Sequence, residues 1–89
     1  MTKEELFEIF EDIDFDDFHK FVLKIYTKAT THDLGPYRKG QYFFNSLYQA
    51  FPHVADMIRG EDLDMFYVDS RIMDFMNIVN EFKEIRDAR

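Results

Sequence analysis

Residues 14–30 read DFDDFHKFVLKIYTKAT, a segment in which apolar side chains recur at every third or fourth position. That spacing places them on one face of an α-helix. Asp14 or Asp16 precedes the apolar series and suits the N-cap of such a helix, because its carboxylate can accept a backbone N–H. The pattern predicts an amphipathic helix that runs to about Thr30. Its apolar face consists of Phe18, Phe21, Val22, Ile25 and Ala29.

The sequence before this segment predicts a shorter, acidic helix. Thr2 followed three residues later by Glu5 is a capping box, and it predicts a helix over about residues 3–12. Residues 1–17 hold eight acidic side chains and one lysine, which account for the whole formal net charge of −7. The second helix has a lysine at every fourth position, and we expect this basic edge beside the acidic helix. The edge consists of Lys20, Lys24 and Lys28.

Three more helices are predicted in the rest of the chain. One begins at Tyr37 or Arg38, after the Gly-Pro pair that ends the preceding helix. A short helix follows over PHVADMIRG (52–60), with its proline in the first turn and its glycine just past the end. Asp69 and Ser70 are placed to cap the last helix.

The organisation of the chain is simple. No segment shows the alternation of a β-strand, an internal repeat or a linker between domains. Eighty-nine residues suffice for one compact domain. We therefore expect an all-α fold, a single small helical bundle over residues 1–89 with about four long helices and one short helix. Its polar tail, at about 84–89, is expected to fray.

Composition and charge exclude several classes of function. Without cysteine, the chain can form neither a disulfide scaffold nor a thiolate zinc site. No apolar run approaches the roughly 20 residues that span a bilayer, and the N-terminus lacks a secretory signal, so we expect a cytoplasmic protein. Lysines and arginines are not clustered as direct binding to nucleic acid or to anionic membranes requires. A protein partner with a basic surface fits the charge better.

The sequence contains no recognisable metal or catalytic motif. Asp12, Asp14 and Asp16 match the first positions of a calcium-binding loop, but Asp17 replaces its glycine and Leu23 replaces its final glutamate. The histidines lack the i, i+4 spacing of a paired metal site, and neither serine lies in a recognisable nucleophile motif. We predict no enzyme, no cofactor and no metal site. A metal-assisted enzyme that uses the acids before the last helix is the least favoured alternative.

Aromatic residues provide the best local indication of a binding surface. Tyr37, Tyr42 and Tyr48 cannot all lie on the inward face of the third helix, and exposed tyrosines are typical of protein interfaces. Phe66 and Tyr67 lie in the longest segment without helical periodicity. We expect them first to cover the open end of the bundle as a hydrophobic plug, and second to contact a partner. The acidic helix adds three candidate contacts to a basic partner, which are Glu4, Glu8 and Glu11.

Two further expectations concern the same loop. Gly40 lowers helix propensity by about 1 kcal/mol relative to alanine, so a close packing contact would be a reason for glycine at this position. Arg59 or Arg38 is expected to pair with Asp64 and to hold the loop against the helices. An exposed pair of this kind contributes less than about 1 kcal/mol.

Residues 37–76 resemble a pattern of small uncharacterised phage and prophage-type proteins. The pattern is R-x-G-Q-x-x-x-N-x-L, then a proline, then R-G-x-x-x-D-x-F-Y ahead of a last helix. Here it is carried by Arg38–Leu47, Pro52, Arg59–Gly60 and Asp64–Tyr67. The resemblance implies a small helical phage-type protein of the host cytoplasm, and it implies no catalytic residues.

These observations favour a non-catalytic, acidic protein-binding module. With the resemblance, the expectation becomes a phage-encoded protein that acts on a host or phage protein. In one version the acidic helix occupies a nucleic-acid-binding site on a basic partner. The main alternative is a homodimer that buries the aromatic face of the third helix and has a structural or regulatory role.

Overall fold

The structure is a computed structural model that describes residues 2–89, and every regular element in that range is an α-helix. The predicted small all-α bundle is confirmed. The third helix begins one or two residues later than predicted, and the fourth is the short one. In chain order the helices are α1 (Lys3–Asp12), α2 (Phe15–Thr31), α3 (Lys39–Ala50), α4 (Pro52–Ile58) and α5 (Arg71–Asp87).

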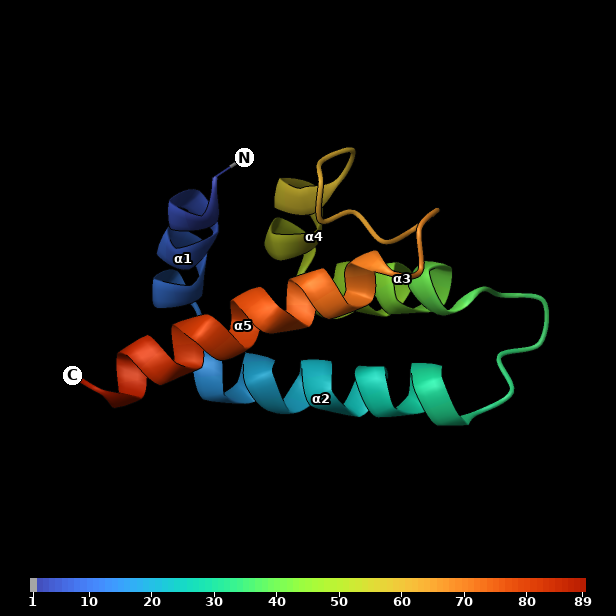
Figure 1. Ribbon diagram of the computed structural model, residues 1–89, viewed down its shortest axis with the longest axis horizontal. Coiled ribbons are helices and arrows are strands. Elements are labelled where there is room, and N and C mark those ends of the chain that lie inside the picture. Colours follow the sequence, from blue (N-terminus) through green and yellow to red (C-terminus); the bar gives the residue numbers. More distant parts are fainter. Residues whose placement is uncertain (1) are drawn as a thin grey trace.

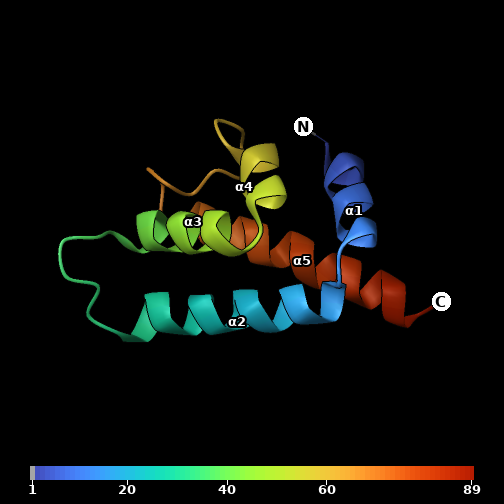
Figure 2. The same cartoon turned by 180° about the vertical axis from the view of Figure 1, so that it is seen from behind.

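α2, α3 and α5 pack together as a group of three helices, and α1 and α4 lie along one edge of this group (Figure 1). α2 and α3 lie side by side, and α5 crosses one face of this pair (Figure 1). The view from behind shows the opposite face, with α2 and α3 in front of α5 (Figure 2). α1 and α4 both extend away from the same edge of the three-helix group and contact each other. The core therefore lies where α1 and α4 meet the three longer elements.

Local interactions fix where most of these helices begin and end. The Thr2 hydroxyl accepts the Glu5 N–H, and the Glu5 carboxylate accepts the Thr2 N–H, so the predicted capping box starts α1. Of the two candidate caps for α2 it is Asp14 that accepts a backbone N–H. Gly60 follows the end of α4 with a φ of 74°, which glycine adopts without strain. Ser70 stands at the N-cap of α5 as predicted, although its side chain makes no capping bond among the described residues.

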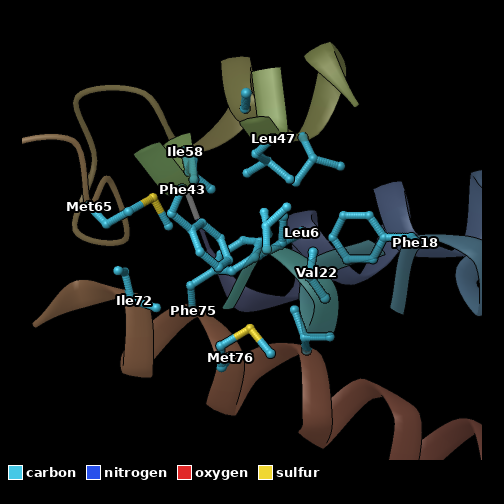
Figure 3. Close-up of a cluster of buried hydrophobic side chains, with 14 of the residues drawn as sticks. Leu6, Phe18, Val22, Phe43, Leu47, Ile58, Met65, Ile72, Phe75 and Met76 are labelled. Atoms are coloured by element: carbon cyan, nitrogen blue, oxygen red, sulfur yellow. The ribbon is translucent and has the colours of Figure 1, made fainter. Parts of the chain in front are cut away.

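Phenylalanine rings fill the centre of the bundle. Three fully buried rings come from three helices: Phe18 from α2, Phe43 from α3 and Phe75 from α5 (Figure 3). The Phe75 ring meets each of the other two edge to face. A second group of rings connects α1 with the end of α5, where the centres of the Phe10 and Phe82 rings are 5.3 Å apart. Burying such rings stabilises a small domain strongly, because each removes a large apolar area from water. This aromatic core explains how a chain of this length holds five helices together.

The C-terminal tail differs from the prediction. We expected residues 84–89 to fray, whereas α5 continues to Asp87. Two ion pairs connect this end to the first two helices. The Arg86 guanidinium lies 2.7 Å from the Asp16 carboxylate of α2, and the Arg89 guanidinium lies 2.8 Å from the Glu11 carboxylate of α1. Within the helix, a hydrogen bond from Lys83 holds the pKa of the Asp87 carboxyl below its ordinary value. Contacts across the fold thus support a tail whose composition alone predicted fraying.

The acidic helix does not lie against the lysine edge of α2, so that expectation is wrong. α1 pairs with α5 instead, where Lys3 contacts Glu81 at 2.9 Å. The physical reason is apolar packing, because Leu6 and Phe10 bury the inner face of α1 in the core and thereby fix where the helix sits. Two members of the lysine edge, Lys24 and Lys28, line a groove between α2 and α3, whereas Lys20 lies outside this groove.

The loop between α4 and α5 crosses α3 at Gly40. A Cβ atom built on Gly40 would lie 1.9 Å from the backbone oxygen of Met65, a distance no real pair of atoms can keep. At the same point the Gly40 N–H donates to the Asp69 carboxylate at 3.0 Å. The expected close contact at this glycine is therefore present, and it is a contact with backbone, which cannot rotate away.

Replacing Gly40 with alanine tests this contact. Alanine favours the helix by about 1 kcal/mol, but its methyl group must displace the loop backbone. We expect Gly40→Ala to lower the free energy of unfolding by about 1–3 kcal/mol, as overpacking commonly does. Urea unfolding followed by circular dichroism measures the change. Gln49→Ala, at an exposed position of the same helix, is the control and should change stability by less than about 0.5 kcal/mol. Equal stability of both variants would contradict the close contact.

Candidate protein-binding surface

Met65 is the loop residue that enters the core. Its side chain is fully buried, and Figure 3 shows it pointing toward Phe43 and Ile72. The sequence-based prediction placed Phe66 and Tyr67 there. Phe66 is half-buried, whereas Tyr67 is 76% exposed, so the predicted plug is wrong for Tyr67 and partly right for Phe66. Because the loop backbone touches α3 at Met65, this residue and not its neighbours is directed inward.

Two acidic residues of the loop, Asp64 and Asp69, accept backbone N–H groups. The Asp64 carboxylate accepts the N–H groups of Gly60 at 2.7 Å and Phe66 at 3.0 Å. Asp69, which we expected to cap α5, accepts the N–H of Gly40 instead. Within residues 2–89, no group of three or more histidine, aspartate or glutamate side chains is placed to hold a metal ion. Two of the acids that suggested metal chemistry therefore have structural partners.

Arg38 holds the end of the loop from the side of α3. Its guanidinium donates to the carbonyl oxygen of Phe66 at 2.6 Å and lies 5.6 Å from the centre of the Tyr67 ring. We had expected Arg38 or Arg59 to pair with Asp64, and this expectation is wrong. The Asp64 carboxylate binds backbone N–H groups of its own loop instead, and the guanidinium groups of Arg38 and Arg59 lie over aromatic rings.

Arg59 lies over two aromatic rings of α3. Its guanidinium is 5.1 Å from the centre of the Tyr48 ring and 5.6 Å from that of Phe44. A cation over an aromatic ring at an exposed site contributes about 0.5–1 kcal/mol. The Asp56 carboxylate lies 3.7 Å from the same guanidinium. These contacts keep the flat face of an arginine on the rings at the surface.

Together these residues surround a shallow cleft of about 290 Å³. Tyr48, whose ring contacts the lining residue Arg59, is 44% exposed, and Tyr67, which lines the cleft itself, is exposed more fully. Tyrosine and arginine are among the residue types that contribute most to binding energy at protein interfaces. We refer to the cleft and its border as the Tyr48–Tyr67 surface, which comprises Phe44, Asn45, Tyr48, Arg59, Asp64, Phe66 and Tyr67.

The structure separates the predicted binding residues into groups. Tyr48, Phe66 and Tyr67 share the Tyr48–Tyr67 surface, whereas Tyr37 and Tyr42 line a different hollow on the outer side of α3. Tyr37 is 52% exposed and Tyr42 is half-buried. The three tyrosines therefore do not all lie on the inward face of the third helix, which agrees with the prediction from their spacing.

The acidic candidates lie elsewhere. Glu4 and Glu8 are exposed on α1, while Glu11 pairs with Arg89. α4 stands between α1 and the loop that carries Tyr67 (Figure 1). A partner of the aromatic surface would therefore have to extend past α4 to reach the acidic helix.

Sequence reasoning assigned no binding role to Arg59 of this surface or to Arg38, which lies beside Tyr67. Their contacts with Tyr48 and Tyr67 depend on the path of the loop, and no sequence spacing encodes that path. The only signal was indirect, since both arginines belong to the pattern of residues 37–76.

Comparisons with models of known protein families, with curated proteins and with solved structures find no match to this chain. Among residues 2–89, no helix has both the length and the apolar character needed to cross a membrane. The geometry of the surface therefore carries the functional argument.

The roles of the loop residues can be separated by mutation. Met65→Ala removes a fully buried side chain and is expected to lower the free energy of unfolding by about 2–5 kcal/mol. Tyr67→Ala removes an exposed ring and should change it by less than about 0.5 kcal/mol. Chemical denaturation of both variants checks this difference. If Tyr67→Ala were the more damaging change, the loop would be inserted as the sequence predicted.

Proposed function

We propose that this protein is a non-catalytic protein-binding module that uses the Tyr48–Tyr67 surface. The observation that carries the proposal is the exposure of Tyr67 on a loop whose backbone is held at several points. An apolar ring normally leaves water when the chain offers it a buried place. Here the buried place belongs to Met65, and Tyr67 stays outside beside Arg38.

The loop that presents Tyr67 is organised before any partner arrives. Arg38 binds the Phe66 carbonyl, and Asp64 binds the N–H of the same residue. The Arg71 guanidinium donates to the Asp64 carbonyl at 3.2 Å. A binding segment that is already ordered loses little conformational freedom on association, which favours affinity. This support distinguishes the loop from an ordinary mobile connection.

The residues around the cleft suit recognition better than catalysis. Three aromatic rings and the guanidinium group of Arg59 form most of it, and its one carboxylate, on Asp64, accepts two backbone N–H groups. No serine, threonine or histidine lines it. A nucleophile with a neighbouring base, which covalent catalysis requires, is not among the lining residues.

The resemblance of residues 37–76 to phage-type proteins supports a host or phage protein as the partner. The exposed carboxylates of α1, Glu4 and Glu8, would contact a basic region of that partner beyond α4. A homodimer is the second candidate, because a surface that contains both tyrosines and arginines can pair with a copy of itself.

Quantitative affinity purification from the native host tests the proposal. Tyr48→Ala combined with Tyr67→Ala should reduce recovery of the true partner at least about tenfold, because central aromatic residues each contribute about 2 kcal/mol or more to an interface. The purified partner is then titrated against both proteins by calorimetry. Ile85→Ala is the matched control, since Ile85 is also an exposed apolar residue, at 43%, but lies on α5. It should bind as the unmodified chain does.

Two other outcomes are decisive. If every recovered protein binds the double variant and the unmodified chain equally, the Tyr48–Tyr67 surface is not the binding site. If sedimentation velocity shows a concentration-dependent dimer that the double variant cannot form, the homodimer replaces the partner complex.

A further inference from the structure

A second hollow lies between α2 and α3, away from the Tyr48–Tyr67 surface. It has a volume of about 350 Å³. Its apolar lining includes Phe21 and Ile25 from α2, and Tyr42 and Ala50 from α3. α5 covers one face of the α2–α3 pair (Figure 1), whereas no helix crosses the face seen in Figure 2 within the described part of the chain. We refer to this hollow as the α2–α3 groove.

The charge beside this groove is opposite to that of the protein. The chain carries a net charge of −7, yet residues 18–32 and 39–50 contain no acidic residue at all. Lys24 and Lys28 line the groove, and Lys20 continues the row along α2. All three are exposed, and none of them forms an ion pair with a described residue. Lys28 lies over the Tyr42 ring, 5.7 Å from its centre.

We infer that the α2–α3 groove is a docking site for an acidic amphipathic helix of a partner protein. Lysines at i, i+4 and i+8 form a row about 12 Å long, given a rise of about 1.5 Å per residue. A helix with carboxylates at the same spacing, laid along α2, places one carboxylate near each lysine. Its apolar face then covers Phe21, Tyr42 and Ala50. Laying an amphipathic helix into a groove in this way is a recurrent form of protein recognition.

Two other anionic occupants fit the groove less well. Nucleic acid would place phosphates beside an apolar floor, on a protein whose overall charge repels it. A second copy of this chain could offer Glu4, Glu8 and Asp12 of α1, which have the matching spacing. However, Leu6 and Phe10 of that helix are buried in its own core and Phe7 and Ile9 are partly buried there, so α1 of a second copy has no fully exposed apolar face to cover the floor. The inference uses other residues than the proposed function and does not depend on it.

A synthetic peptide serves as the probe. It has about 18 residues, which is long enough for an alanine-based helix to form. One face carries leucines, its edge carries glutamates at i, i+4 and i+8, and fluorescein reports binding by anisotropy. We expect saturable binding that weakens as salt rises from about 50 mM to about 500 mM, because the lysines are exposed. A peptide with lysines in place of the glutamates should not bind.

Variants of the groove locate the site. Lys24→Glu with Lys28→Glu should weaken binding at least about tenfold, since two attractive contacts become repulsive. Lys24→Gln with Lys28→Gln should produce an intermediate loss, and circular dichroism verifies that both fold. The control is Lys3→Glu with Lys83→Glu, which changes the net charge equally but lies on α1 and α5. Because these changes remove the ion pairs with Glu81 and Asp87, circular dichroism must show that the control folds as well. The control should bind the peptide as the unmodified chain does.

Several results would overturn the inference. Absence of peptide binding at low salt would do so, as would equal affinity of the Lys24/Lys28 variants and the control variant. Tighter binding of single-stranded DNA or of phosphatidylserine vesicles than of the acidic peptide would assign the lysine row to phosphate groups instead.

Discussion

The contact between Gly40 and the backbone of Met65 organises the half of this protein that carries the Tyr48–Tyr67 surface. Only a residue without a side chain lets the loop lie directly on α3, because a Cβ atom there would be 1.9 Å from the Met65 oxygen. The Gly40 N–H, bonded to Asp69, fixes the start of α5 at the same place. One glycine thus determines both the path of the loop and the point from which the last helix departs.

The orientation of the aromatic residues follows from this contact. Once Met65 is directed into the core, the next two residues turn progressively toward solvent, and Phe66 packs on Phe44 while Tyr67 remains outside. The guanidinium of Arg38 lies over the exposed Tyr67 ring of the loop, and that of Arg59 lies over the exposed Tyr48 ring of α3. A flexible methionine suits the buried position, because it can fill an irregular gap between Phe43 and Ile72.

The sequence predicted the helices well because each has a local cause, such as the Thr2–Glu5 capping box or the apolar face of α2. It predicted the close contact at Gly40 for the same reason, since a glycine inside a helix requires an explanation. It gave Met65 no role, and it misassigned Tyr67 and the partner of Asp64. Those depend on which loop residue meets α3, and the loop has no periodicity from which to read its register. Tyr48, Phe66 and Tyr67 of the proposed surface were therefore named from the sequence, but their arrangement was not.

The distribution of charge also depends on packing across the whole fold and could not be predicted from neighbours in the sequence. Sequence proximity suggested that the acidic α1 would neutralise the lysines of α2, but the burial of Leu6 and Phe10 places α1 against α4 and α5. Its carboxylates and those at the start of α2 then meet arginines at the end of the chain, where Glu11 pairs with Arg89. Apolar packing outweighs exposed ion pairs, each of which contributes at most about 1 kcal/mol. Lys24 and Lys28 are consequently left beside an apolar groove with no ion pair to a described residue, in a protein whose net charge is negative.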